Sequence, residues 1–232
     1  MLESVIRRAV DLESTWAPRY CNEALIVRGV EQITRGGQQI YRHSRRPLPF
    51  DMTGPRPSRA RTSNASRFSR STARRITDSS IQNYLAGLFN AGTETPNTSV
   101  LYGVYFPSGM RISLSGGSSC TSFCGYHSNF TYNGMDIKYA VFPYPNCSGC
   151  SLSGKTVADM LTIVTSHEIR EAVTDSDGTA WWDASGYEAD DKCAWHNLYQ
   201  TTNGGYWVQP EYSNGGTIGG TFYPGPGCVV PR

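Results

Sequence analysis

The distribution of cysteine constrains this chain more than any other feature of its sequence. Six of the seven cysteines lie between residues 120 and 228, and Cys21 alone lies outside that stretch. The stretch is also rich in tyrosine and glycine, which are typical of strands and turns. An even number of cysteines in such a background indicates disulfide bonds and an oxidising compartment, although fifteen pairings are compatible with the sequence. The six are Cys120, Cys124, Cys147, Cys150, Cys193 and Cys228.

Charge divides the chain in two. Residues 1–76 hold 15 Arg against 6 acidic residues, whereas residues 77–232 hold 6 Lys and Arg against 13 acidic residues. The sequence therefore predicts a basic, largely flexible arm over residues 1–75, rich in Arg, Ser and Pro, and a cysteine-rich globular body over residues 76–232. Such an arm is one way to bind nucleic acid or another polyanion. Few aromatic residues and no recognisable module disfavour that function here.

Apolar runs and sequons bear on the location of the protein. No apolar run of about 18 residues or more occurs, so we expect no membrane span. The amino terminus lacks the apolar core of a secretory signal, which indicates unconventional export or a different mature terminus. The cysteine pattern still favours a secreted glycoprotein. Its candidate glycosylation sites are Asn64, Asn97, Asn129 and Asn146.

Two segments of the body have the periodicity of helices. The first begins at Thr77 or Asp78, both good N-caps, and is expected to end at Gly92. The second begins with a capping box between Thr156 and Asp159 and is expected to extend over residues 157–171.

Shorter segments of the body predict strands. Residues 99–106 and 110–114 flank a Pro-Ser-Gly turn and predict a β-hairpin. Residues 137–142 and 206–212 predict two further strands. We therefore expect an α+β fold in which the second helix packs on a mixed or antiparallel sheet, stabilised by disulfides.

The second helix carries the sequence SHEIRE at residues 166–171. His167 and Glu171 are four residues apart, so their side chains project from the same face of the helix. Zinc peptidases place two ligands at this spacing, with a glutamate between them as general base, the role expected here of Glu168. The second ligand of such peptidases is usually histidine. Whether glutamate at position 171 preserves a metal site decides whether the protein is an enzyme.

Catalytic zinc requires three protein ligands, and three residues are candidates for the third. Glu188 lies beyond the helix, where one class of zinc peptidase has its third ligand. Asp191 follows it, as a ligand or as a second-sphere partner of a histidine. His127 would have to return from a distant loop. A second carboxylate makes the site harder and more anionic, so calcium or another divalent ion is an alternative to zinc.

Simpler interpretations stay open for each of these patterns. The carboxylates of the helix are compatible with a solvated face beside a hydrogen-bonded histidine. The cysteines at 120, 124, 147 and 150 also have the spacing of a structural zinc site, although disulfides are favoured. Four aromatic residues either pack in the core or are exposed and bind sugars: Trp181, Trp182, Tyr187 and Trp195.

Four separated segments occur in order: FCGYH at 123–127, YPNCSGC at 144–150, TSHEIREAVTD at 165–175 and EADDKCAW at 188–195. Together with LYGVYFP at 101–107, they resemble a family of secreted fungal and bacterial proteins distantly related to the plant phosphate-induced, or Exordium-like, cell-wall proteins. The resemblance covers roughly residues 76–228. The chain departs from the family at Ser176, where proline is usual, and over residues 1–75.

This resemblance implies an extracellular, disulfide-bonded protein with a fold that is zincin-like at best. It groups six residues in one site: His127, His167, Glu168, Glu171, Glu188 and Asp191. Two functions follow as expectations. One is a secreted, zinc-dependent, peptidase-like hydrolase that acts on peptides. The other is a non-catalytic extracellular or cell-wall protein that binds glycan or another cell-wall polymer. The sequence sets no expectation for the oligomeric state.

Overall fold

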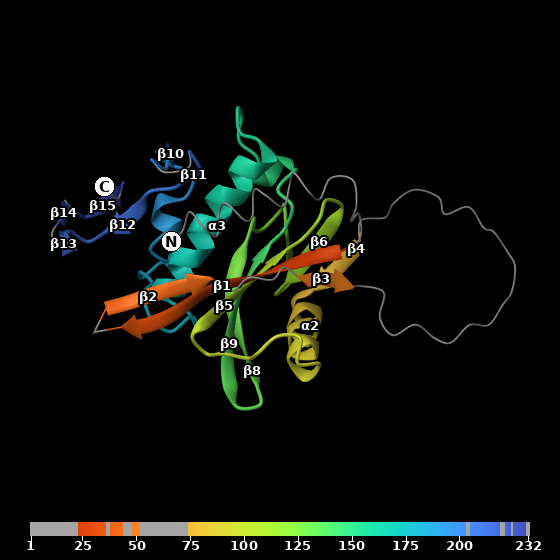
Figure 1. Cartoon of the computed structure of the whole chain (residues 1–232). Helices are drawn as coiled ribbons and strands as arrows, with labels where there is room; N and C mark the ends of the chain where they lie inside the picture. The colour runs from red at the N-terminus through yellow and green to blue at the C-terminus, as the bar shows by residue number, and fades with distance from the viewer. Residues whose placement is uncertain are drawn as a thin grey trace, which may run out of the picture.

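The computed structural model describes most of the body and four stretches of the arm, the last of which is residues 74–75 (Figure 1). Cys21 and Asn64 lie outside the described residues. No helix among the described residues is long and apolar enough to cross a membrane. The described ranges are 23–35, 38–43, 48–51, 74–202, 205–218, 221–223 and 225–230.

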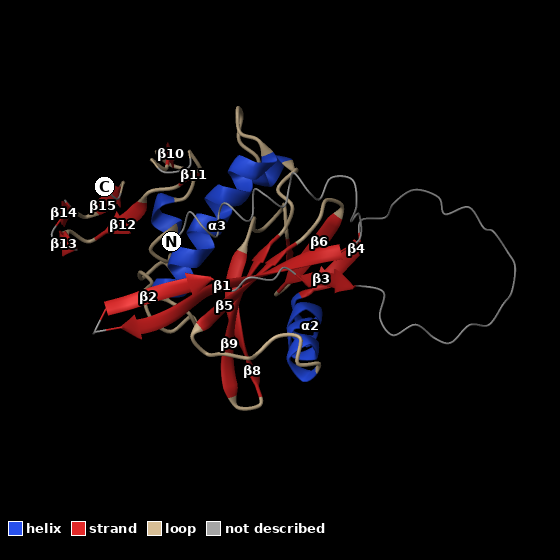
Figure 2. Ribbon diagram, viewed as in Figure 1, coloured by secondary structure: helices blue, strands red, loops and turns tan. Residues whose placement is uncertain are grey.

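A mixed six-stranded sheet forms the centre of the molecule (Figure 2). Its order is β2-β1-β5-β9-β8, with β3 also paired to β1. Strands β5 (Val100–Tyr105) and β9 (Met135–Phe142) run parallel, whereas β8 (Tyr126–Tyr132) pairs with β9 antiparallel. The sheet is therefore mixed, and the strand expected over residues 137–142 is confirmed as part of β9.

The two long helices cover opposite faces of this sheet. Helix α2 (Asp78–Asn90) contributes Ile81, Leu85 and Phe89 to a cluster with one face of β5 and β9. Helix α3 (Val157–Thr174) packs Leu161 and Val164 against the other face. Side chains alternate along a strand, so neighbouring residues of β5 and β9 serve the two helices in turn. The α+β class and the packing of the motif helix on a mixed sheet are confirmed.

Both helices begin as their sequences predict. Thr77 caps α2 by accepting the Ser80 N–H at 3.2 Å, and the left-handed Gly92 follows its C-cap. Thr156 and Asp159 form a reciprocal capping box at the start of α3. Helix α3 continues three residues beyond the expected end at Glu171 and ends at Thr174.

The main sheet crosses the boundary expected at residue 76. Strands β1 (Glu23–Arg35), β2 (Gln38–His43) and β3 (Leu48–Asp51) belong to the expected arm, and β1 pairs antiparallel with β5. These three strands belong to the same sheet as β5 and β9. The edge of β5 not used by β9 offers unpaired backbone groups, which an added strand satisfies.

The hairpin expected over residues 99–106 and 110–114 is wrong, although both strands exist. Strand β6 (Met110–Leu114) pairs in parallel with β4 (Arg74–Thr77) and antiparallel with β7 (Gly117–Ser118), not with β5. Five of the six residues of β5 are buried. Burial on both faces fits a central strand rather than one arm of a hairpin.

Short strands and two 3-10 turns make up the rest of the body. The strand expected over residues 206–212 is divided into β11 (Trp207–Val208) and β12 (Glu211–Ser213), which pair with β10 (Tyr199–Gln200) and β15 (Gly227–Val229) respectively. The remaining elements are β13 (Gly216–Ile218), β14 (Thr221–Tyr223), and the 3-10 turns η1 (Ser148–Cys150) and η2 (Asp191–Cys193).

All six body cysteines are paired. The disulfides are Cys120–Cys147, Cys124–Cys150 and Cys193–Cys228. The disulfide interpretation is confirmed, and the alternative of a structural zinc site at the first four cysteines is wrong because their sulfurs are bonded to one another.

Candidate metal centre

Residues far apart in the sequence converge beside the carboxyl-terminal half of α3. The helix supplies His167, Glu168 and Glu171, while His127 comes from β8 on the adjacent sheet. Asp191 begins the turn η2, which the disulfide Cys193–Cys228 ties to β15. The fold therefore brings helix, sheet and carboxyl-terminal loop together around one group of histidines and carboxylates.

One set of ligand atoms forms around His167. Its Nε2 lies 3.1 Å from Glu171 Oε2 and 3.6 Å from Asp191 Oδ1. These three residues, called the His167 triad below, place one ligand atom each within 4.8 Å of the others. The Asp191 side chain is 38% exposed and the His167 side chain 17%, so solvent reaches this side of the site.

A second set forms deeper in the protein, around His127. Its Nδ1 lies 3.6 Å from Glu168 Oε2 and 3.8 Å from Glu171 Oε2. These residues, the His127 triad, also lie within 4.8 Å of one another, and their side chains are 7% exposed or less. Among the described residues, no such group contains both histidines. The single site expected from sequence is therefore two triads that share Glu171.

Glu188 belongs to neither triad. Its Oε1 lies 3.6 Å from His127 Nε2, on the side of the ring that faces away from Glu168. That oxygen is buried and accepts no hydrogen bond from the residues that the structure describes. Of the two carboxylates expected beyond the helix, the structure thus places Asp191 next to His167 and Glu188 behind His127.

Each histidine has its other nitrogen held by a hydrogen bond. His127 Nε2–H donates to the carbonyl oxygen of Asp175 at 2.9 Å, which leaves Nδ1 facing its triad. His167 Nδ1–H donates to Gln209 Oε1 at 3.3 Å, which leaves Nε2 facing Glu171 and Asp191. Metal-binding histidines are typically oriented in this way by a carbonyl or carboxylate partner.

Gln209 and Arg170 complete the support of His167. Gln209 Nε2 donates to the carbonyl oxygen of Asp190 at 2.9 Å, which turns its Oε1 toward His167. Arg170 donates to the Gln209 carbonyl oxygen at 2.6 Å and pairs with Asp190 at 3.4 Å and Glu211 at 2.8 Å. Gln209 cannot be recognised from the sequence, because a lone glutamine near a short strand has no local pattern. Arg170 lies within the motif but is not one of its ligand positions.

The carboxylates strongly affect both histidines. Burial disfavours the charged imidazolium of His127, but the carboxylates of Glu168 and Glu188 outweigh it and raise the pKa of His127 to about 9. Burial likewise opposes protonation of His167, while Glu171 and Glu168 raise its pKa to about 10. Burial raises the pKa of Glu168 and, with the charge of Glu171, raises that of Glu188 to about 7. Without an ion, protons compensate the negative charge of the site.

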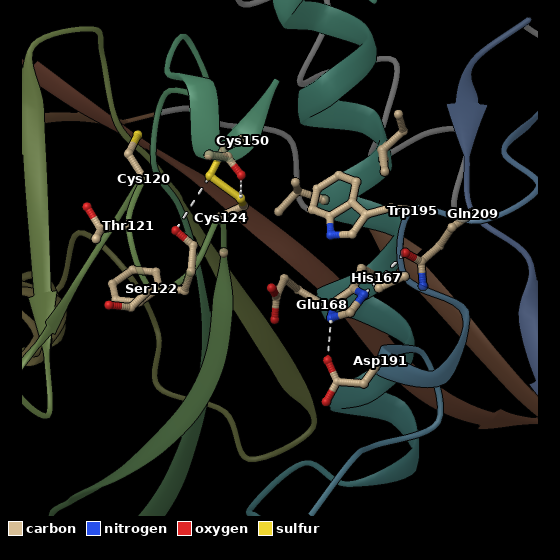
Figure 3. Close-up of a pocket in the computed structure, with 16 residues that line it drawn as sticks. Cys120, Thr121, Ser122, Cys124, Cys150, His167, Glu168, Asp191, Trp195 and Gln209 are labelled. Carbon is tan, nitrogen blue, oxygen red and sulfur yellow. Dashed lines mark hydrogen bonds and ion pairs between the residues drawn. A yellow bond between two sulfur atoms is a disulfide. The ribbon is translucent and has the colours of Figure 1, made fainter. Parts of the chain in front are cut away.

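A pocket of about 310 Å³ opens beside the His167 triad (Figure 3). His167, Glu168 and Asp191 line one side, and the Cys124–Cys150 disulfide lines another. Trp195 also lines the pocket; its side chain lies near His167, and its backbone is left-handed, with φ of 64°. The pocket thus borders His167 and Asp191 of the triad, and the largely buried Glu168 forms part of its wall.

The four aromatic residues expected either to pack in the core or to be exposed separate into two groups. Trp181 contacts Tyr212, with ring centroids 5.8 Å apart. Trp182, Tyr187 and Trp195 are instead 60%, 56% and 41% exposed. Core packing does not account for these three side chains.

The described candidate glycosylation sites differ in accessibility. Asn146 is exposed, although its Nδ2 donates to Ser108 Oγ at 3.0 Å. Asn97 is partly buried in the loop before β5. Asn129 lies within β8 and its Nδ2 donates to Asp136 at 2.7 Å. Asn146 is the most open of the three to attachment of a glycan.

Comparisons of the chain with family models, with curated proteins and with solved structures return no match. The geometry of the two triads and the pocket therefore carries the functional conclusion.

Proposed function

We propose that the protein is a secreted, metallopeptidase-like hydrolase with a divalent ion, zinc in the first instance, bound by the His167 triad. The observation that carries this proposal is the convergence of three ligand atoms next to Glu168 and an accessible pocket. The three disulfides and the resemblance to secreted Exordium-like proteins support an extracellular location.

Two of the three distances between ligand atoms of the triad are close to those around a zinc ion. Tetrahedral ligands 2.0–2.2 Å from a zinc ion lie about 3.3–3.6 Å from one another. His167 Nε2 lies 3.1 Å from Glu171 Oε2 and 3.6 Å from Asp191 Oδ1, close to those edges. The hydrogen bond from His167 to Gln209 fixes the tautomer that presents Nε2 as a ligand.

The residues around the triad have distinct tasks. A divalent ion bound there would polarise a peptide carbonyl and acidify a water molecule. Glu168 would accept a proton from the attacking water; its position in the pocket wall and directly after His167 supports this role. Burial raises the pKa of Glu168, which makes it a stronger base than an exposed glutamate. His127, 3.6 Å away, limits that rise and orients the carboxylate.

The Glu168→Gln variant tests this proposal. We expect hydrolysis of a peptide library, read by mass spectrometry, to fall about 10²- to 10⁴-fold, because the amide cannot accept the proton. At least one equivalent of bound metal should remain, since Glu168 is outside the His167 triad. Asp136→Asn is the control, because Asp136 is on β9 and interacts only with Lys138 and Asn129 among the described residues. Wild-type peptide hydrolysis by Glu168→Gln would refute the assigned role.

A second function, binding of cell-wall polysaccharide, is favoured by the exposure of Trp182, Tyr187 and Trp195. Aromatic rings with one apolar face free stack on sugar rings. On this alternative, the double variant Trp182→Ala, Tyr187→Ala loses co-sedimentation with insoluble β-glucan, and Glu168→Gln retains it. No co-sedimentation of the wild type would eliminate the alternative.

A further inference from the structure

The carboxylates around the two triads carry more negative charge than one divalent ion neutralises. Four carboxylates lie within 4.0 Å of the two imidazoles: Glu168, Glu171, Glu188 and Asp191. Among the described residues, no Lys or Arg nitrogen forms an ion pair with these four groups; the nearby Arg170 pairs with Asp190 and Glu211. One divalent ion would neutralise two of the four carboxylates and leave the other two to be compensated by protons or by a second cation, because buried charges are costly unless compensated.

The second set of ligand atoms has the organisation of the first. In both triads a histidine nitrogen and two carboxylate oxygens face one another, at 3.1 and 3.6 Å around His167 and at 3.6 and 3.8 Å around His127. In both, a hydrogen bond to an oxygen acceptor holds the opposite ring nitrogen. Glu188 adds a further carboxylate beside the His127 triad, since its buried Oε1 lies 3.6 Å from Nε2 of His127 and accepts no hydrogen bond from the described residues.

We propose that the His127 triad holds a second divalent transition-metal ion, so that Glu171 Oε2 bridges two ions. Glu171 Oε2 is the closest carboxylate oxygen to His167 Nε2 and also faces His127 Nδ1. Hydrolases with two metal ions hold them about 3.5–4 Å apart, often with a shared oxygen ligand. One nitrogen and two oxygens per ion suit zinc or manganese.

This inference rests on the proposed function, because the ion in the His167 triad is the first of the pair. It also assigns separate tasks to the two oxygens of Glu168. Oε2 faces His127 Nδ1 and would bind the second ion. Oε1 lies toward Gly125, which lines the pocket, and stays available to accept a proton.

Metal stoichiometry of the full chain tests the proposal. Chelator-stripped protein is titrated with Mn²⁺, and bound metal is measured by elemental analysis after gel filtration. Electron paramagnetic resonance then tests whether two Mn²⁺ ions are magnetically coupled. We expect two equivalents and a coupled signal in the wild type, one equivalent in His127→Ala and in His167→Ala, and two in the control Asp136→Asn.

The outcomes separate this inference from the proposed function. One uncoupled equivalent that survives His127→Ala overturns the second site and leaves the proposed function standing. One equivalent that disappears in His127→Ala overturns the two-ion site, as it assigns the sole ion to the His127 triad. Bound metal below about a tenth of an equivalent overturns both. If a variant fails to fold, the wild-type stoichiometry and coupling decide alone.

Discussion

Gly125 shows how a single residue sets the position of the expected base. It lies where the chain enters β8 beside α3. A Cβ atom at this position would lie 2.6 Å from Val164 Cγ1 and 2.7 Å from Glu168 Oε1. Both distances are shorter than real contacts of a Cβ atom. Any side chain here would displace the helix or the Glu168 carboxylate.

We predict that Gly125→Ala destabilises the protein by about 1–3 kcal/mol, the usual cost of overpacking. It should also lower peptide hydrolysis, because Glu168 moves. Gly87→Ala is the matched control: Gly87 is within α2, no atom lies within 4 Å of its added Cβ, and alanine favours a helix by about 1 kcal/mol. Urea unfolding of both variants measures the effects. Equal stability of the two variants would show that a Cβ atom at position 125 is accommodated without overpacking.

Among the elements, the helices were the part that the sequence predicted well. Capping and apolar spacing are local signals, so both helix starts and the shared face of His167 and Glu171 follow from neighbouring residues. Strand pairing is non-local, and adjacent strands β5 and β6 joined different sheets for that reason. The partners Gln209 and Asp175 approach the histidines through tertiary contacts alone. No local pattern could reveal them.

Hydrogen bonds at Asp78 connect helix α2 to the sheet next to the site. Asp78 Oδ1 accepts hydrogen bonds from the hydroxyl groups of Tyr126 and Tyr139, each at 2.6 Å. Its Oδ2 accepts a hydrogen bond from Gln82 Nε2 at 2.7 Å. Tyr126 immediately precedes His127 on β8. The Asp78 carboxylate therefore helps to place the strand that supplies the second histidine.

We predict that Asp78→Ala lowers the free energy of unfolding by about 2–4 kcal/mol, because two buried tyrosine hydroxyls lose a charged acceptor. Asp136→Ala, which removes a carboxylate bonded to Lys138 and Asn129 on β9, should change it by less than about 1 kcal/mol. Urea denaturation of the two variants compares them. A cost for Asp78→Ala no larger than that of the control would contradict this role.

For the whole molecule, a rise in pH should lower the stability of the ion-free protein, whereas bound metal should raise the stability. The folded pKa values of His127 and His167 are about 9 and about 10, above the unfolded value of about 6.5. The ion-free folded protein therefore binds more protons than the unfolded chain between those values. The stability that these two histidines contribute is fully present below about pH 6.5 and is lost as pH rises through their folded pKa values.

We predict that, with chelator, Tm falls between about pH 6.5 and pH 9.5. Ligands must be deprotonated to bind metal, so the increase in Tm caused by Mn²⁺ or Zn²⁺ grows over the same range. Thermal scans with chelator and with metal measure both trends. A Tm that rises with pH in chelator, or a metal effect that shrinks, would contradict the assignment of these histidines.

The most direct test of the central claim is elemental analysis of the protein purified without added chelator. A protein whose His167 triad is a metal centre should contain at least one equivalent of zinc or another divalent transition metal. His167→Ala should lose that equivalent, while the matched variant His196→Ala, at an exposed histidine in the loop after η2, should keep it. Less than about a tenth of an equivalent in the wild type, even after incubation with Zn²⁺, would contradict the account.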